Sequence, residues 1–457
     1  EESDRRLSIF AVGDDDQNIY RFRGANIGFI KRFREDYQAK VRYLVENYRS
    51  SGHIVAAANH LIAHNSDRMK TDHAIVVNQA RAAMPAGGNW QLADHVGQGR
   101  VQVLQVDDAG GQAVAVLEEI RRLQGISDQF SLARTAILAR EWRELDPLRA
   151  ACEANQIAVT LNWAKSSFPG LTRIREYAVL LAFLREHREE QISAHTLRQF
   201  LPQEAGSDNL WQAHLRGLIE EWREETGNRP QPVVRIEQYL YESLAERHRS
   251  GQSGSGVFLS TVHSVKGLEF DHVFVLGSGW RCHTGPEMEE ERRLYYVAMT
   301  RARQTLQLLE RADRTNPHTE ILAGDWVLRR RLLGRGGRCL PSHRYHLLGM
   351  SDLYLDYAGR FREQHPVHGA LHRCGVGDRL QPVVRNGHVD LLDRHGVAIG
   401  RLSKAARDVW LRQLPAVRSV TVLAMVRWGR DDGVERDDPG LYRCASWEVP
   451  ICEVVTG

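Results

Sequence analysis

The stretch VQVLQVDDAGGQAVAVLEEIRRLQGISDQFSLARTAILAR, residues 101–140, alternates apolar segments with a helix-forming segment. The same alternation continues for some twenty residues beyond it. It predicts strands at 101–106, 134–139 and 157–161, with helices at 112–124 and 143–155. Strands that alternate with helices in this way form a parallel sheet. We therefore expect the start of a doubly wound α/β domain.

On the N-terminal side, shorter apolar segments extend the pattern. The predicted elements are a strand at 7–12, a helix at 26–37, a strand at 41–46 and a polar loop at 66–99. Ser50 and Ser51 are good helix starters, so a further helix is expected to begin there and to end near Asn65.

On the C-terminal side, the alternation breaks near Trp163 and resumes after the flexible SGQSGSG of 250–256. The intervening residues are charged and helical in pattern, and Trp211 and Trp222 are expected to lie in the core of this insertion. The resumed part predicts strands at 257–261, 272–277 and 304–309 and a helix at 288–302.

The pattern of apolar and polar residues changes again near residue 335. Short apolar runs within 376–455 are separated by dipeptides typical of hairpin turns, namely Asn386-Gly387, His395-Gly396 and Asp432-Gly433. A small β-rich module is therefore expected to close the chain, either as an accessory contact surface or in a structural role.

The composition is that of an ordinary globular protein, with 457 residues, 42% of them apolar. No apolar run approaches the ~20 residues of a membrane helix, and the N-terminus carries no targeting signal, so a cytoplasmic location without a membrane partner is expected. Lysines and arginines total 61, of which only six are lysine, and arginine forks suit phosphate contacts. An arginine-biased genome is nevertheless the favoured explanation for most of the arginines.

Four segments carry the chemistry. They are GDDDQNIYRFRGA at 13–25, ENYRSS at 46–51, STVHSVKGLEF at 260–270 and EERRLYYVAMTRAR at 290–303. In this order they closely resemble motifs III, IV, V and VI of the UvrD/Rep/PcrA family of superfamily 1 DNA helicases. Four ordered motifs make coincidence improbable, whereas any one short motif carries a false-positive risk.

The resemblance implies a RecA-like fold and a domain plan for the chain. The expected parts are the end of a first RecA-like domain at 1–40, a second RecA-like domain at 41–165 and 256–334, a helical subdomain inserted at 166–255, and a β-rich accessory module at 335–457. It also implies ATP hydrolysis with Mg²⁺, movement along single-stranded DNA in the 3′ to 5′ direction, and contact with duplex DNA.

The first of these segments, residues 13–25, is expected to contact two different ligands. In open α/β sheets, ligands bind beyond the carboxyl ends of strands, and Gln17 follows the apolar run that precedes Gly13. A glutamine amide there can sense a phosphate or orient a water. The resemblance implies that Gln17 is the γ-phosphate sensor. The acids Asp14, Asp15 and Asp16 could be magnesium ligands, but the resemblance makes them turn and capping residues.

The second half of that segment alternates aromatic rings with cations, a combination that stacks unpaired bases and holds their backbone. The candidate DNA contacts here are Tyr20, Phe22 and Arg23. Phe22 stands where these helicases commonly carry a tryptophan, so its stacking area is smaller, and a core phenylalanine is the other interpretation.

The remaining roles are implied by the resemblance alone. On the nucleotide side, Tyr48 would stack on adenine, Arg49 would reach the γ-phosphate, Glu269 would bind a ribose hydroxyl, and Arg301 would be the arginine finger. Gly267 would also belong to the ATP-binding residues. On the DNA side, Thr261, His263 and Lys266 would touch strand phosphates. Arg292 and Arg293 are expected to pair with Glu289, Glu290 or Glu291 on their own helix.

Two parts of the helicase pattern are absent from the sequence. No G-x-x-x-x-G-K-[ST] phosphate loop occurs, and no apolar strand ends in Asp-Glu before Gly13. The chain is therefore expected to be the C-terminal part of a helicase, inactive alone, whose partner is the missing N-terminal half.

Other interpretations remain open. The absent phosphate loop favours a non-catalytic protein that binds single-stranded DNA or acts as a scaffold. A helicase-nuclease is disfavoured because no lysine has an acid two residues before it. His60 and His64 have a spacing that can bind metal, but no third ligand is evident. The six cysteines form no C-x-x-C pair, so they are expected to be reduced and structural.

Overall fold

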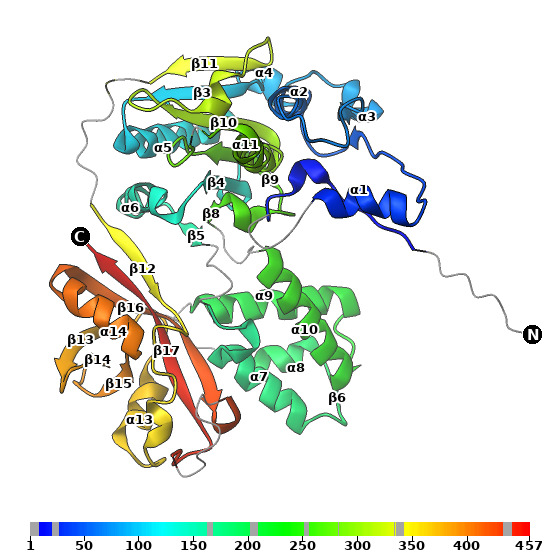
Figure 1. The fold of residues 1–457 in the computed structure, drawn as a ribbon. Coiled ribbons are helices and arrows are strands. Elements are labelled where there is room, and N and C mark those ends of the chain that lie inside the picture. Colours follow the sequence, from blue (N-terminus) through cyan, green and yellow to red (C-terminus); the bar gives the residue numbers. More distant parts are fainter. Residues whose placement is uncertain are drawn as a thin grey trace, which may run out of the picture. The chain divides into compact units, whose positions relative to one another are not determined.

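The fold is known from a computed structural model, which describes residues 9–20, 27–161, 168–201, 209–250, 256–281, 283–332, 334, 342–432 and 441–457 (Figure 1). The chain divides into two compact units. The first contains residues 1–159 and 256–340, and the second contains residues 160–255 and 341–457. Each unit is therefore built from two segments that are separated in the sequence.

The first unit is organised around a seven-stranded sheet whose strand order is β11-β3-β10-β9-β4-β8-β5. The strands are β3 (Val101–Val106), β4 (Thr135–Ala139), β5 (Val159–Leu161), β8 (Val257–Thr261), β9 (Phe270–Val275), β10 (Ala302–Arg311) and β11 (Val327–Arg331). Register is parallel for the pairs that join β11, β3, β10, β9, β4 and β8. The predicted α/β fold class is thus confirmed.

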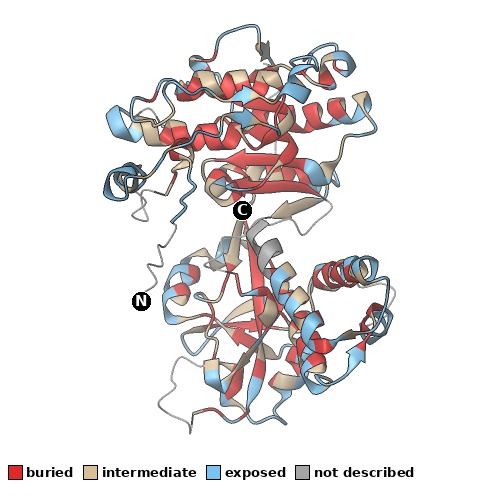
Figure 2. Cartoon of the chain, turned by 90° about the vertical axis from the view of Figure 1, so that its right-hand side faces the viewer, coloured by how far each residue is buried: buried red, intermediate tan, exposed pale blue. Residues whose placement is uncertain are grey.

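Helices cover both faces of this sheet. Val103, Leu138 and Val275 belong to a core shared with α2 (Gly52–Ile62) and α11 (Gly285–Met299). Alternate residues of a strand point to opposite faces, so Leu104 and Ile137 lie on the other face. There α5 (Ala109–Ile126) packs on β3 and β10, and α6 (Asp146–Ala154) packs on α5. Because both faces are covered, the central strands are buried along their length (Figure 2), and their sequences are mostly apolar.

The N-terminal segments pack at the edge of this unit. They are the 3₁₀ turn η1 (Asp15–Gln17), α1 (Ile27–Asp36), and the two-residue strands β1 (Glu46–Asn47) and β2 (Val76–Val77), which pair in parallel. Three short helices complete the unit: α3 (Gln79–Ala82), α4 (Trp90–Ala93) and α12 (Pro317–Glu320).

Two predicted strands are wrong in the residues that the structure describes. Residues 9–12 form no strand, and Phe10 is 90% exposed. Of the strand predicted at 41–46 only Glu46 is in β1, and Leu44 is 82% exposed. An apolar run becomes a buried strand only where a neighbouring strand pairs with its backbone along its length. Residues 9–12 have no paired strand in the described part of the chain, and the run at 41–46 is paired only at its end, where Glu46 lies opposite Val76 and the Val76 N–H donates to the Val45 carbonyl at 2.9 Å.

The second unit combines the helical insertion with the β-rich module. The insertion has α7 (Arg175–Glu186), α8 (Ala194–Phe200), α9 (Leu210–Thr226) and α10 (Val233–Ser250), with a small sheet of β6 (Gln191–Ile192) and β7 (Gln231–Pro232). Trp211 and Trp222 are buried in this insertion, as predicted. The domain boundaries themselves stay a prediction.

The β-rich module is an antiparallel sheet of order β12-β17-β16-β13-β14-β15. Its elements are β12 (Arg344–Leu348), β13 (Arg379–Arg385), β14 (His388–Leu392), β15 (Ala398–Arg401), β16 (Val417–Gly429) and β17 (Ser446–Thr456), with α13 (Pro366–Arg373) and α14 (Lys404–Gln413). Asn386 and Gly387 have φ of 49° and 73°, the left-handed conformation that a tight hairpin turn requires. The hairpin predicted there joins β13 to β14, and the turn at Gly396 joins β14 to β15. Gly433 lies outside the described residues.

One hydrophobic core joins the two parts of the second unit. Leu215 and Leu218 of α9 belong to the same buried cluster as Val422 of β16 and Ile451 of β17. The Trp211 indole N–H also donates to the Leu423 carbonyl at 2.8 Å. The insertion and the C-terminal module therefore fold as one body.

No helix in the described part of the chain has the length and apolar character needed to cross a membrane. The cysteines that the structure describes, Cys152, Cys374, Cys444 and Cys452, are buried and unpaired, in agreement with the sequence.

Candidate functional site

The first part of the site is the turn that carries Gln17. Asp14 caps this turn, because its carboxylate accepts from the Asp16 N–H at 3.2 Å. The other oxygen of Asp14 accepts from the Gln17 side-chain amide Nε2 at 2.6 Å. The amide is thereby oriented with its oxygen, Oε1, pointing away from the acids.

Arg301 lies on the other side of that amide oxygen. Its Nη2 donates to Gln17 Oε1 at 3.1 Å and to the Thr300 hydroxyl at 3.1 Å. Its Nε and Nη1 donate to the Val297 and Leu268 carbonyls at 3.0 and 3.2 Å. With 1% of its surface exposed, Arg301 is fixed by backbone acceptors and presents Nη2 to Gln17.

Arg49 brings a second guanidinium to the same place. It forms an ion pair with the Glu269 carboxylate, and its Nη1 donates to the Thr300 carbonyl at 3.3 Å. Arg303 lies 3.9 Å from the second oxygen of Glu269. Burial, followed by the nearby positive charge of Arg49, lowers the pKa of Arg301 to about 10. The site is therefore strongly cationic and partly desolvated, which favours a polyanionic ligand.

A local turn explains the position of Arg49. The Asn47 side-chain oxygen accepts from the Arg49 and Ser50 N–H groups at 2.9 and 2.8 Å. The Ser50 hydroxyl donates to the Ala302 carbonyl at 2.6 Å, which ties the turn to the start of β10. Between these anchors Tyr48 is 66% exposed, and its hydroxyl donates to Glu46 at 2.6 Å. One aromatic ring thus projects into solvent beside the cationic group.

The site lies at the amino ends of two strands. Glu269 directly precedes β9, and Arg301 directly precedes β10. The sequence argument placed Gln17 beyond the carboxyl end of a strand at 7–12, but the described residues 9–12 form no strand. Gln17 is instead positioned by the capped turn and by Arg301.

The residues predicted to contact DNA lie against the same turn. Lys266 Nζ donates to the Gln17 backbone carbonyl at 2.9 Å and lies 5.4 Å from the centre of the Tyr20 ring. The Tyr20 hydroxyl donates to the His263 carbonyl at 2.9 Å. Burial lowers the pKa of Lys266. Tyr20, His263 and Lys266 therefore form one cluster that is bonded to the backbone of the proposed phosphate sensor.

Gly267 and Thr261 complete this region. Gly267 has φ of 93°, a conformation that L side chains rarely adopt, so glycine is required where the chain turns from Lys266 towards β9. Thr261 ends β8, and its hydroxyl lies 3.2 Å from that of Ser264. Phe22 and Arg23 lie outside the described residues.

The three acids of the turn are held by three consecutive residues of the loop after α2. The Arg68 guanidinium donates to both oxygens of Asp16 at 2.8 Å, the Met69 N–H donates to Asp15 at 2.6 Å, and the Lys70 ammonium donates to Asp14. The carboxylates lie close enough together to hold a metal ion. A guanidinium and an ammonium already neutralise them, so this acid group does not fit Mg²⁺.

Sequence reasoning missed Arg68 and Lys70. Both lie in a stretch that was predicted only as a polar loop, and neither belongs to a recognised motif. The one available signal was charge, because a basic pair follows α2 while three consecutive acids occupy the turn at Asp14 to Asp16.

Of the two arginines of α11 that were expected to pair with acids of their own helix, only Arg293 does so. Arg293 does lie 3.5 Å from Glu289, four residues before it, but its Nη2 also donates to the Asp67 carbonyl at 2.5 Å. Arg292 donates to the His64 carbonyl and to the Asn65 side chain at 3.0 and 2.5 Å, so its predicted pairing within the helix is wrong. The helix geometry is suited to both pairings, but the loop after α2 supplies nearer acceptors.

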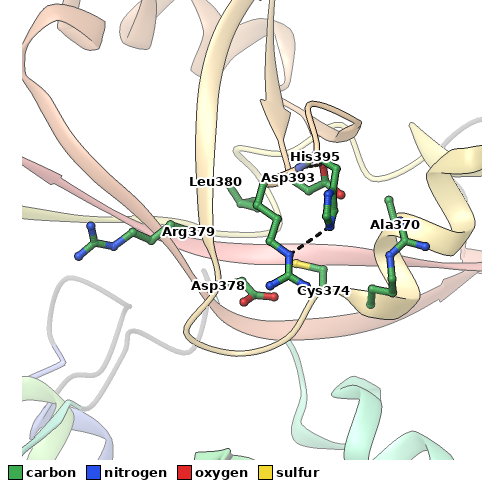
Figure 3. A pocket seen from close by; sticks show the side chains of 9 residues that line it. Ala370, Cys374, Asp378, Arg379, Leu380, Asp393 and His395 are labelled. Atoms are coloured by element: carbon green, nitrogen blue, oxygen red, sulfur yellow. Dashed lines mark hydrogen bonds between the residues drawn. The ribbon is translucent and has the colours of Figure 1, made fainter.

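Two further features lie elsewhere. His60 Nε2 lies 2.9 Å from the Ile321 carbonyl, an ordinary structural contact. In the second unit, a cavity of about 220 Å³ opens between the end of α13, the start of β13 and the β14–β15 turn (Figure 3). There Asp378 and Asp393 accept from backbone N–H groups, and Arg394 contacts His395 at 3.2 Å. The side chains that line this cavity carry both positive and negative charges, so the cavity favours no particular class of ligand.

Two family models match this chain. The one described as the UvrD-like helicase C-terminal domain matches residues 42–205 and 173–310. The one described as the UvrD/REP helicase N-terminal domain matches residues 2–38. The matches together cover each of the four motif segments.

Individual relatives agree with these matches. An ATP-dependent DNA helicase PcrA of Staphylococcus epidermidis is 26% identical over an alignment of 390 residues, and the match covers 69% of this chain and 52% of the relative. A DNA helicase II of Haemophilus influenzae is 28% identical over 65% of this chain and 50% of the relative, and that of Escherichia coli is 27% identical over 66% and 51%. The chain thus spans about half the length of the curated relatives it matches.

A solved structure, the C-terminal domain of a possible DNA helicase from Lactobacillus plantarum, covers 62% of this chain and 98% of its own. Its TM-score of 0.29 and identity of 15% are too low to establish a shared fold.

Proposed function

This chain belongs to the UvrD-like helicase family, and from that premise we propose that it serves within an ATP-dependent DNA helicase to couple ATP hydrolysis to 3′ to 5′ movement on single-stranded DNA. One observation carries the proposal. Gln17 and Arg301 lie 284 positions apart in the sequence, yet the amide oxygen of one accepts a hydrogen bond from the guanidinium of the other. A sensor and an arginine finger that touch the same phosphate must lie this close together.

The nucleotide would be bound by an exchange of partners. Arg49 is paired with Glu269, and both side chains are about one-third exposed, so a phosphate can compete for the guanidinium. Once Arg49 turns to the γ-phosphate, the Glu269 carboxylate is free to accept a ribose hydroxyl. The exposed ring of Tyr48 is available to stack on adenine, and the backbone at Gly267 lies beside Glu269.

Hydrolysis would depend on charge neutralisation at the γ-phosphate. Arg301 and Arg49 stabilise the negative charge that develops on the transferred phosphoryl group, and the Gln17 amide orients the attacking water. Mg²⁺ would act on the phosphates in the complete enzyme, but the group of Asp14, Asp15 and Asp16 does not fit it, because Arg68 and Lys70 already neutralise these acids.

Movement on DNA would be linked to hydrolysis through Lys266. Its ammonium bonds the Gln17 carbonyl and lies beside the Tyr20 ring, while the resemblance assigns it to a DNA phosphate. A shift of the Gln17 turn would therefore directly move the residues that hold the DNA strand. Tyr20, His263 and Thr261 would contribute to the same surface, and the resemblance adds Phe22 and Arg23 as DNA contacts, although both lie outside the described residues.

A direct experiment compares ATPase activity with DNA binding. The 457 residues alone should bind single-stranded DNA but show no appreciable DNA-stimulated ATPase, because the sequence contains no phosphate loop. Joined to an N-terminal segment that carries the phosphate loop and the magnesium carboxylate, they should hydrolyse ATP, and Gln17→Ala should reduce this activity severely, to a small residual rate. DNA binding without ATPase in the joined protein would favour a non-catalytic DNA-binding protein. Robust turnover by the 457 residues alone would refute the assignment of the missing parts.

A further inference from the structure

We propose that Lys70 and Arg68 are positioning residues for catalysis, which hold the acid turn so that Gln17 faces Arg301. The inference rests on the proposed function, since it concerns the same phosphate sensor. It adds two residues outside the four motif segments.

The first support is register. Three consecutive loop residues contact three consecutive acids in reverse order, so the loop and the turn form a clamp defined by Arg68, Met69 and Lys70 on one side and Asp14, Asp15 and Asp16 on the other. Lys70 also lies 3.5 Å from Asp16. Contacts that involve every residue of both segments fix the turn along its length, not at one point.

The second support is burial. The Asp16 side chain is 1% exposed and the Arg68 side chain 9%, which identifies their two-pronged bond as the interior of the clamp. The Lys70 side chain is 11% exposed, whereas Asp14 is 31% exposed. Burial would lower the pKa of Lys70, but the carboxylates of Asp14 and Asp16 more than offset it, and the pKa is raised. Lys70 therefore stays protonated and bound to the acids.

The third support is the direction of the hydrogen bonds. Lys70 donates to one oxygen of Asp14, and the other oxygen accepts from Gln17 Nε2. Because the amide nitrogen is held by an acid, the amide oxygen is left for Arg301. A glutamine amide can rotate by half a turn at little steric cost, and in that orientation it would present a donor to a guanidinium that is also a donor. The clamp thus selects the productive orientation.

The fourth support links the clamp to the helix that leads to Arg301. Glu289 near the start of α11 accepts from the Ser66 N–H and hydroxyl at 2.8 and 2.6 Å and from the Asp67 N–H at 3.3 Å. Arg293 on the next turn donates to the Asp67 carbonyl. One helix therefore braces the loop that carries the clamp and ends beside the arginine finger.

Lys70→Met is the informative variant. It removes the ammonium but keeps the length of the side chain, and it leaves Asp16 paired with Arg68, so the fold should survive. In the helicase that joins these residues to a phosphate loop, we expect kcat for ATP to fall about 10–100-fold, the scale of a misplaced catalytic group, with KM changed by less than about threefold. Lys70→Arg should restore most of the activity.

Lys31→Met is the matched control. Lys31 also pairs with an aspartate of this loop, Asp67, but both side chains are about half exposed, so its loss should change neither kcat nor thermal stability. Thermal unfolding of the 457-residue chain checks that Lys70→Met is folded.

The double variant decides between positioning and general stability. If Lys70 acts through Gln17, Lys70→Met should have no further effect on the residual ATPase of Gln17→Ala. Wild-type kcat in Lys70→Met, or a further loss in the double variant, would overturn the inference while leaving the proposed function in place. Unchanged ATPase in Gln17→Ala would instead refute the proposed function.

Discussion

Arg49 and Arg301 offer a paired test, because the structure assigns them the same ligand but very different surroundings. We consider each replaced by alanine. Arg301 is 1% exposed and donates to the Val297 and Leu268 carbonyls, the Thr300 hydroxyl and Gln17. Arg49 is bound mainly by Glu269, in a pair whose side chains are 30% and 35% exposed.

The stability losses should therefore differ. An ion pair as exposed as that of Arg49 with Glu269 contributes about 0.2–1 kcal/mol, so Arg49→Ala should lower Tm by no more than a few degrees. Removing Arg301 leaves buried acceptors unpaired at roughly 1–3 kcal/mol each, and the total should be on the order of 3–5 kcal/mol.

The catalytic losses should be alike. Arginines that neutralise a transferred phosphoryl group contribute roughly 10³–10⁵ in rate, which corresponds to about 4–7 kcal/mol in the barrier. The assay has two parts, namely DNA-stimulated ATPase of the complete helicase and denaturant unfolding of the 457-residue chain. Single-stranded DNA affinity, measured alongside, should be nearly unchanged in both variants.

Two results would refute this reasoning. ATPase within a few-fold of the parent in either variant would remove that arginine from the phosphate site. Equal unfolding free energies for the two variants would mean that the four hydrogen bonds of Arg301 do not carry the stability assigned to them.

Two further predictions concern DNA coupling and acid stability. Phe22→Ala should remove stacking of about 1–3 kcal/mol per base, so the number of base pairs unwound per ATP should fall while ATPase activity is retained. Gln17→Ala should lose both unwinding and ATPase activity. An unchanged number of base pairs unwound per ATP in Phe22→Ala would mean that Phe22 is a packing residue. Burial, followed by the charge of Arg292, lowers the pKa of His318 to about 3. The neutral imidazole therefore stabilises the fold above pH ~6.5, and the free energy of unfolding should decrease as the pH falls towards 3. The expected loss is about 2 kcal/mol at pH 5. Both ring nitrogens of His318 are buried without a partner, so His318→Phe should flatten the pH dependence of urea unfolding by that amount; identical slopes would contradict the assignment.

The sequence predicted best those elements whose burial is two-sided. The segments at 101–106 and 257–261 became β3 and β8 with the predicted bounds, because covered strands of a parallel sheet are mostly apolar and alternate with helices along the chain. The turn at Asn386 and Gly387 was predicted equally well, because these two residues readily adopt the left-handed conformation that the turn requires.

The clamp could not be predicted in the same way. Arg68 and Lys70 are ordinary surface-type residues in a loop, and only the approach of the acid turn, 52 and 56 positions away in the sequence, gives them partners. The strand expected at 41–46 failed for the same reason, because pairing is decided by a neighbour that the local pattern does not contain. The shared core of the second unit likewise required the fold to bring Trp211 and Leu423 together.

That shared core also sets an order of events during synthesis. The indole N–H of Trp211 cannot bond to the Leu423 carbonyl until Leu423 is translated, 212 positions later. At roughly 5–20 residues per second, this takes about 10–40 s. Throughout that interval Leu215 and Leu218 lack the strands that bury them in the finished protein, while the whole second half of the parallel sheet is made. The nascent helical segment must therefore remain soluble with part of its apolar face unburied, and its packing is completed only when β17 leaves the ribosome.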